Sequence, residues 1–338
     1  MAIIERVWYG HGAIALAGRI ALSPLELLYR GIVAARGAMF DRGVRASAQS
    51  SIPVISVGNL TVGGTGKTPI ASWVASELAR RGMRPAIVLR GYGDDEPAVH
   101  RLLTPGISVI ASADRLAGVR RARAAGCDVG VLDDAFQHRQ LRRAADVVLV
   151  SAERWRADAR LLPAGPYREP PSALRRATLV VVTRKSASRE AADEVVRWVH
   201  RVAPQVAVAK IHLTPDELRS WDDATRASVS GLVGERILAI AAIGDPWAFA
   251  RQLQSLGATV ELRAFRDHHA FTDRDAQHLA AQAARFDRVV CTLKDAVKLG
   301  PVWPRAASRL WYVSQRVRME SGAGALDRLL DGIAASVR

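Results

Sequence analysis

Short aliphatic runs recur along the chain, and segments of helical periodicity follow several of them. Residues 52–57 form such a run, and residues 67–81 then place Ile70 and Leu78 on one face of a helix. Further strands of this kind are expected at 85–89, 107–111, 129–132, 146–151 and 178–183. Continuous apolar runs are typical of strands covered on both faces, as in parallel sheets. The pattern therefore predicts an α/β fold with a mostly parallel sheet and helices on both faces.

A second α/β pattern begins near Arg236. Its expected strands lie at 237–243, 259–265, 288–292 and 310–313, and its expected helices at 247–256, 273–285 and 324–337. The stretch 214–231 between the two patterns is rich in Asp, Ser and Thr and is interpreted as a linker. We therefore expect a larger α/β domain at 46–220 and a second, smaller α/β domain at 232–338.

The N-terminal segment, residues 1–45, has a different character. Its first 40 residues are unusually apolar, but arginines interrupt them, and the longest uncharged run spans only residues 7–18. A spanning helix needs about 20 apolar residues, so this segment is too short to cross a membrane. Two interpretations remain open: apolar helices lying in a membrane interface, or a helical pair packed on the protein's own core.

The charge of the chain narrows the class of partner. Among 338 residues, 48 are Lys or Arg and 33 are Asp or Glu, which gives a net charge of +15. A positive field favours nucleic acid, anionic lipid headgroups or phosphorylated substrates. No recognisable nucleic-acid-binding motif accompanies the charge. Cys127 and Cys291 lie in apolar stretches without metal-ligand spacing and are expected to be buried thiols.

A glycine-rich loop stands between the first strand and the first helix. It reads Gly58-Asn-Leu-Thr-Val-Gly-Gly-Thr-Gly-Lys-Thr-Pro69, the context that a phosphate-binding P-loop requires. Backbone N–H groups and the helix N-terminus would hold phosphate oxygens, Lys67 would reach the β- and γ-phosphates, and the Thr68 hydroxyl would bind Mg²⁺. The nucleotide-binding residues expected here are Gly63, Gly64, Thr65, Gly66, Lys67 and Thr68. Thr61 departs from the usual pattern, which has glycine at that position.

Two acidic residues follow a neighbouring apolar strand. Asp133 and Asp134 come directly after residues 129–132. P-loop enzymes hold Mg²⁺ with a carboxylate at the end of such a strand. Together the loop and the acids predict a P-loop NTPase-like domain in a nucleotide-dependent phosphotransferase, with metal ligands Thr68, Asp133 and Asp134.

These residues belong to a larger set of blocks that resembles one family, the tetraacyldisaccharide 4'-kinases, which phosphorylate the lipid A precursor. The resemblance covers nearly the whole chain, and Thr61 is also typical of that family. The blocks are the apolar N-terminus, Val57-Gly58-Asn59, Gly63 to Pro69, Arg90-Gly91-Tyr92-Gly93, Asp95-Glu96-Pro97, Asp133 to His138, Leu162 to Pro166, Arg168-Glu169-Pro170, Ile243 to Pro246, Asp267-His268-His269 and Cys291 to Lys298.

The resemblance implies a specific reaction and setting. The γ-phosphoryl group of ATP would pass to the 4'-hydroxyl of a tetraacylated disaccharide 1-phosphate, with Mg²⁺, between two α/β/α domains. The enzyme would be peripheral to the cytoplasmic face of the bacterial inner membrane. This setting favours the membrane-interface interpretation of residues 1–45. Neither a nucleic-acid partner nor an obligate protein partner is expected.

The resemblance also implies roles for residues outside the P-loop. Asp95 would be the general base for the sugar hydroxyl, and His268 would hydrogen-bond and polarise that hydroxyl from the second domain. Arg168 would steady phosphate charge, with Glu169 beside it as a substrate residue. Gln137 and His138 would support the nucleotide and metal site. One departure from the family is a short loop, which leaves only Gly93 and Asp94 between Tyr92 and Asp95.

Other interpretations stay open. Asp95 could belong to a solvated acidic turn, His268 and His269 to the surface, and Lys294 and Lys298 to either a structural cap or a substrate contact. The runner-up function is a regulatory P-loop NTPase without a lipid acceptor. No Asn-Lys-x-Asp block for guanine is present, and a carboxylate with a histidine suits an alcohol acceptor better than water.

Overall fold

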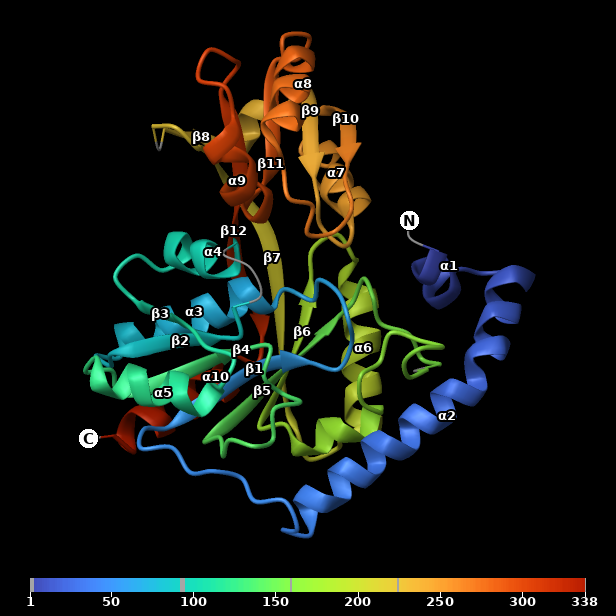
Figure 1. Cartoon of the computed structure of the whole chain (residues 1–338), viewed down its shortest axis with the longest axis vertical. Coiled ribbons are helices and arrows are strands. Elements are labelled where there is room, and N and C mark those ends of the chain that lie inside the picture. Colours follow the sequence, from blue (N-terminus) through green and yellow to red (C-terminus); the bar gives the residue numbers. More distant parts are fainter. Residues whose placement is uncertain (1–2, 92–94, 159, 224, 338) are drawn as a thin grey trace.

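The computed structural model describes residues 3–91, 95–158, 160–223 and 225–337. Its strands form one curled sheet in the order β10-β9-β11-β12-β7-β6-β5-β1-β4-β2-β3, and β8 pairs with β7 beside this path (Figure 1). All pairings are parallel except those of β7 with β12 and of β7 with β8. The expected α/β fold with a mostly parallel sheet is confirmed.

The strands and helices of the first pattern lie close to their expected positions. The strands are β1 (Val54–Asn59), β2 (Pro85–Leu89), β3 (Ser108–Ala111), β4 (Val129–Asp133), β5 (Ala145–Ser151) and β6 (Leu179–Arg184). The helices are α3 (Lys67–Arg80), α4 (Asp95–Leu103), α5 (Arg115–Ala124), α6 (Arg189–Val202) and the 3-10 helix η1 (Pro171–Arg176). Burial is nearly complete along β1, β2, β4 and β6, as continuous apolar runs require.

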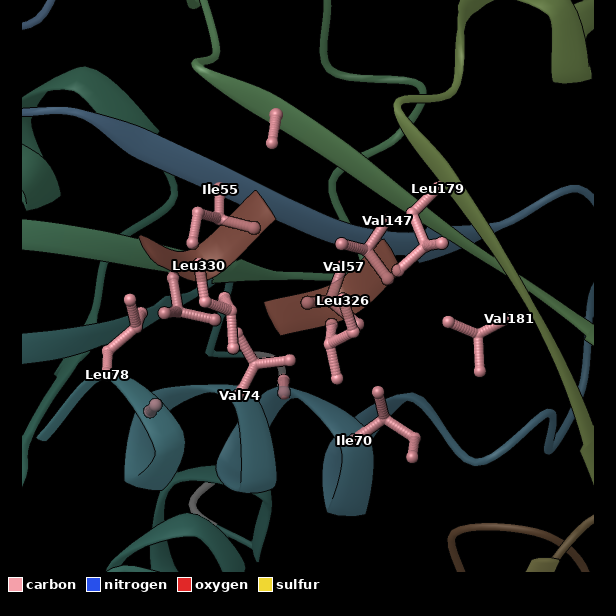
Figure 2. Packing of buried hydrophobic residues seen from close by; sticks show 14 of the residues in the cluster. Ile55, Val57, Ile70, Val74, Leu78, Val147, Leu179, Val181, Leu326 and Leu330 are labelled. Carbon is pink, nitrogen blue, oxygen red and sulfur yellow. The ribbon is translucent and has the colours of Figure 1, made fainter. Parts of the chain in front are cut away.

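Helices cover both faces of this part of the sheet. Alternate residues of a strand point to opposite faces, so Ile55 and Val57 of β1 pack towards α3, whereas Val54 packs with Val119 of α5. On the α3 side, Ile70, Val74 and Leu78 meet the strands (Figure 2). Leu326 and Leu330 of the last helix, α10 (Ala323–Ala335), join the same core. Helix α10 therefore packs in the same hydrophobic core as α3, the helix that follows the P-loop.

The second α/β pattern forms the other end of the sheet. Its elements are β9 (Arg236–Ala241), α7 (Pro246–Gln254), β10 (Thr259–Ala264), α8 (Asp273–Ala283), β11 (Arg288–Thr292), α9 (Leu293–Leu299) and two 3-10 helices, η2 (Val229–Leu232) and η3 (Gly300–Val302). Helices α8 and α9 pack on one face of these strands and α7 on the other. The sequence-based strands and helices of this half are confirmed.

Two long strands join the halves. β7 (Ala207–Ser220) begins parallel to β6 and continues antiparallel to β12 (Leu310–Ser321), and its end also pairs with β8 (Arg226–Ser228). The linker expected at 214–231 is therefore wrong over residues 214–220 and 226–228, where the chain is strand, and over 229–231, where it is 3-10 helix. The polar side chains of residues 214–220 lie on a half-exposed strand held by β12. The division into domains at 46–220 and 232–338 stays a prediction.

Two helices precede the sheet. Helices α1 (Ile3–Tyr9) and α2 (Ala13–Asp41) lie along the outside of the molecule (Figure 1). Large apolar side chains of α2 face solvent; Ile14 is 90% exposed and Leu27 is 67% exposed. Glu26 is an exception, because it is buried and accepts hydrogen bonds from Leu161 N at 3.0 Å and Arg160 Nε at 2.8 Å. None of the helices in the described ranges is long and apolar enough to cross a bilayer.

Candidate active site

A cleft of about 770 Å³ lies where the two halves of the sheet meet. Its floor is built from the carboxyl ends of parallel strands, where open α/β sheets bind their ligands. The expected residues that line it are Gly63, Gly64, Thr65, Gly66, Lys67, Thr68, Asp133, Asp134, Gln137, His138, Arg168 and His268. Residues far apart in sequence thus share one cavity, of a size suited to a nucleotide and part of a second substrate.

The P-loop connects β1 to α3. Gly63 and Gly66 adopt positive φ angles of 104° and 89°, a conformation that side chains other than glycine rarely take. A Cβ atom at Gly63 would also collide with the guanidinium group of Arg154. Lys67 Nζ donates to Asn59 Oδ1 at 3.3 Å, and Asn59 Nδ2 donates to Thr65 Oγ1 at 2.9 Å. These contacts connect the end of β1 to the loop and to the start of α3.

Asp133 lies at the end of β4 and is buried. Its Oδ2 accepts a hydrogen bond from Thr68 Oγ1 at 3.4 Å and contacts His100 Nε2 at 3.0 Å. Its Oδ1 is also buried but has no hydrogen-bond partner among the described residues. Burial alone would raise the pKa of Asp133, but the hydrogen bond with His100 and the charge of Lys67 outweigh it and lower that pKa. An ionised, buried and unpartnered carboxylate oxygen fits a cation ligand.

The donor set suits Mg²⁺ held together with a nucleotide. In the described part of the chain, no three His, Cys, Asp or Glu side chains gather closely enough to hold a metal by themselves. Mg²⁺ in nucleotide sites needs only one or two carboxylates, and water and phosphate oxygens complete its shell. Thr68 and Asp133 provide such a partial set.

Asp134 has a different environment from its neighbour. Its two carboxylate oxygens lie 2.9 and 3.1 Å from Arg168 Nη1, and Oδ1 lies 3.7 Å from Lys67 Nζ. Its backbone has a positive φ of 50°, a conformation that costs a non-glycine residue energy and recurs at functional sites. The Asp134 carboxylate therefore contacts both the Arg168 guanidinium group and the Lys67 ammonium group at the mouth of the P-loop.

Gln137 and His138 line the cleft near Asp134 and Arg168. Gln137 Nε2 donates to Asn59 O at 2.9 Å, and its Oε1 lies 3.5 Å from Arg168 Nη1. Burial, reinforced by nearby arginines with Arg115 foremost, lowers the pKa of His138. Helix α2 also reaches this region, because Tyr29 Oη donates to Arg168 O at 3.0 Å. Gln137 thus links the start of the P-loop to the arginine that holds Asp134.

Asp95 and His268 come together from the two halves of the sheet. Asp95 begins α4, and His268 follows β10 in the other half of the sheet. Asp95 Oδ2 lies 3.6 Å from His268 Nδ1. His268 has a φ of 59°, and its backbone N–H donates to Ala242 O at 3.2 Å. In the described residues, Asp134 and His268 are the two non-glycine residues with positive φ, and both line this cleft.

Known proteins are similar to this chain over nearly its whole length. The family model of tetraacyldisaccharide-1-P 4'-kinases matches residues 18–334. The chain is 40% identical to the tetraacyldisaccharide 4'-kinase of Anaeromyxobacter sp. (strain Fw109-5), over 99% of this chain and 97% of that protein. It is 36% identical to the one of Chromobacterium violaceum, over 93% of each.

This chain belongs to the tetraacyldisaccharide-1-P 4'-kinase family. A solved structure agrees with the sequence comparisons: the crystal structure of LpxK from Aquifex aeolicus in complex with ATP superimposes with a TM-score of 0.72 at 28% identity. The match covers 93% of this chain and 99% of that one.

Two of the residues expected at the site, Asp95 and Glu169, are not among those that line the cleft. Glu169 is buried and pairs with Arg176 at 2.7 Å instead of lining the cavity, so the geometry gives no direct support to a substrate contact. The short loop before Asp95 involves Tyr92, Gly93 and Asp94, which lie outside the described residues.

Several cleft residues had no role predicted from the sequence. They are Glu96, Arg115, Arg154 and Lys185. Glu96 follows Asp95 directly, and burial raises its pKa. Lys294 and Lys298, one helical turn apart, differ: Lys298 Nζ lies 3.6 Å from Asp295 Oδ1, whereas Lys294 lines the cleft. Two sequence signals singled out Lys294: the scarcity of lysine in this arginine-rich chain and its place in the block Cys291 to Lys298.

Proposed function

We propose that this protein transfers the γ-phosphoryl group of ATP to the 4'-hydroxyl of a tetraacyldisaccharide 1-phosphate in lipid A biosynthesis. The observation that carries the proposal is the 3.6 Å approach of Asp95 Oδ2 to His268 Nδ1, because His268 lines the same cleft as the P-loop. Family membership supports the choice of acceptor, and the complex of the Aquifex aeolicus protein with ATP supports the choice of nucleotide.

The residues would divide the work as follows. The P-loop and Lys67 hold the phosphates, and Thr68 and Asp133 hold Mg²⁺, which neutralises phosphate charge when bound. The acceptor hydroxyl lies between Asp95 and His268, so that its proton passes to Asp95 as its oxygen bonds to the γ-phosphorus. The bond from that phosphorus to the bridging oxygen breaks, and ADP leaves. Arg168, oriented by Asp134 and Gln137, is placed to donate hydrogen bonds to phosphate oxygens.

The lipid acceptor places the reaction at a membrane surface, which we propose is the cytoplasmic face of the bacterial inner membrane. Support comes from α2, whose exposed apolar side chains include Ile14, Ile20, Leu27, Leu28 and Ile32. Helices with an apolar face and flanking arginines lie in the headgroup region of a bilayer. Tyr29 and Arg36 of the same helix donate hydrogen bonds to backbone oxygens of Arg168 and Gln137, so the proposed membrane helix contacts the site directly.

The test follows label from γ-labelled ATP into tetraacyldisaccharide 1-phosphate in detergent micelles with Mg²⁺. Wild type should label the lipid, and Lys67→Ala and Asp95→Ala should each abolish most of the transfer. Release of free phosphate alone by wild type would overturn the lipid-kinase assignment and favour a regulatory NTPase. Near-normal transfer by Asp95→Ala would leave the kinase standing and remove Asp95 as the base.

A further inference from the structure

A buried histidine connects the proposed base to the proposed metal ligand. His100 lies on α4, the helix that begins with Asp95, and its side chain is fully buried. Its Nδ1 lies 2.8 Å from Ser72 Oγ of α3, and its Nε2 lies 3.0 Å from Asp133 Oδ2 of β4. A buried imidazole is costly unless both ring nitrogens are satisfied, and here both have partners.

The chemistry of the partners sets the direction of these hydrogen bonds. A carboxylate only accepts, so the proton between His100 and Asp133 belongs to Nε2. In the neutral ring Nδ1 then accepts, and the Ser72 hydroxyl donates to it. Ser72 therefore orients the ring, and the ring presents a fixed N–H to Asp133.

This N–H decides which oxygen of Asp133 is left for a cation. His100 and Thr68 both engage Oδ2, whereas Oδ1 is buried without a partner among the described residues. Without the His100 donor, the carboxylate would lose one of the two contacts that set its rotation. Groups that orient a metal ligand in this way typically change metal affinity or activity 10- to 100-fold when removed.

We infer that His100 is a positioning residue that aims Asp133 Oδ1 at the nucleotide-bound cation and holds helix α4, with Asp95 at its start, against the P-loop half. Its side chain is fully buried and does not line the cleft. The inference rests on the proposed function only in taking that cation to be the Mg²⁺ of a bound nucleotide. If His100 only filled space, any side chain of similar size could replace it, with or without a hydrogen bond to Asp133.

Three substitutions separate these roles. His100→Leu keeps most of the volume and removes the donor. His100→Gln can return an amide N–H near the position of Nε2. Ser72→Ala leaves His100 in place but removes the hydroxyl that orients it. The matched control is Ser76→Ala on the same helix, whose hydroxyl donates to Ser72 O at 3.0 Å and does not contact His100.

The first readout is Mn²⁺ binding in the presence of ADP, followed by electron paramagnetic resonance, which needs no lipid and no turnover. We expect His100→Leu to weaken Mn²⁺ binding about tenfold or more and Ser72→Ala to weaken it less. His100→Gln should recover most of the affinity, and Ser76→Ala should match wild type. In the lipid assay, His100→Leu should lower kcat while the KM for ATP changes little.

Wild-type Mn²⁺ affinity in a folded His100→Leu protein would overturn the inference. Equal weakening in His100→Leu and His100→Gln, with equal loss of thermal stability, would also overturn it, because packing alone would then explain both. If His100→Leu does not fold, the Mn²⁺ affinities of Ser72→Ala and Ser76→Ala are compared instead, and equal affinities would overturn the inference. Wild type that binds Mn²⁺ with ADP but labels no lipid would remove the proposed function and leave this inference intact.

Discussion

Asp95 and His268 come from opposite ends of one sheet, and their side chains approach each other beside the cleft that His268 lines. Asp95 follows β2 and His268 follows β10, strands separated by most of the strand order, yet Asp95 Oδ2 and His268 Nδ1 lie 3.6 Å apart. The long strands β7 and β12 carry the sheet from one half to the other and bring these residues together. Because each half of the sheet supplies one residue of the pair, the distance between Asp95 and His268 depends on the relative position of the two halves.

This pairing predicts non-additive kinetics. Asp95→Asn should lower kcat about 10²- to 10⁴-fold, since a general base contributes that much. His268→Ala should cost less, because the carboxylate remains. The double variant should be little worse than Asp95→Asn alone, as for residues that act as a unit. Steady-state kinetics of the three variants with saturating ATP provide the measurement; losses that simply multiply would argue against a shared role.

The two adjacent acids should differ in their dependence on Mg²⁺. Asp133 has a buried carboxylate oxygen without a partner among the described residues, whereas Asp134 contacts Arg168 and Lys67. Asp133→Asn should therefore raise the Mg²⁺ concentration needed for half-maximal activity by about tenfold or more. Asp134→Asn should chiefly raise the KM for ATP, because the Arg168 and Lys67 side chains would lose the carboxylate that holds them. Mg²⁺ and ATP titrations of both variants distinguish these outcomes, and identical profiles would contradict the assignment.

Glu26 should make the anchoring of α2 depend on pH. Burial would raise its pKa, but the Leu161 N–H and the guanidinium groups of Arg160 and Arg30 outweigh it and bring the pKa below the ordinary 4.5. A lowered folded-state pKa adds stability above the unfolded value that is lost as pH falls through the folded one. Glu26→Gln should therefore lower the free energy of unfolding by about 1.5–3 kcal/mol at neutral pH.

The pH dependence provides the check on Glu26. In urea unfolding, the difference between wild type and Glu26→Gln should shrink as the pH falls below about 4.5. Arg30→Ala serves as the control, because the Arg30 side chain is 49% exposed and exposed pairs contribute at most about 1 kcal/mol. A difference that stayed constant as the pH was lowered from neutral through this range would show that charge is not the cause.

The exposed face of α2 should determine attachment to membranes. Replacing Leu27, Leu28 and Ile32 with Ser removes apolar side chains that are 67%, 63% and 58% exposed. We expect co-sedimentation with anionic vesicles to fall by about tenfold or more, since burying each such side chain is worth about 1.5–3 kcal/mol. Val233→Ser is the control, because Val233 is 69% exposed but lies between η2 and β9. Unchanged sedimentation of the triple variant would exclude this face.

Local patterns in the sequence were sufficient to predict much of the fold. β11 has the expected bounds, and α3 ends one residue before the prediction. These elements depend on the spacing of apolar residues and on glycine or proline at their ends, and both can be read from a short stretch of sequence. The P-loop and Asp133 were found for the same reason, since their chemistry follows directly from a strand and its succeeding turn. The pairing of Asp95 with His268 was expected only through family resemblance.

Tertiary structure alone decided the rest. The second half of β7 was interpreted as part of a linker because the stretch is rich in Asp, Ser and Thr. Pairing with β12, about 100 positions later, makes it a strand. His100 meets Ser72 and Asp133, which are 28 and 33 positions away, and Glu169 turns to Arg176. Such contacts depend on the order in which strands join the sheet. The sequence by itself thus determined the strands, helices and phosphate loop, while the curled sheet decided which side chains meet, because periodicity does not encode strand order.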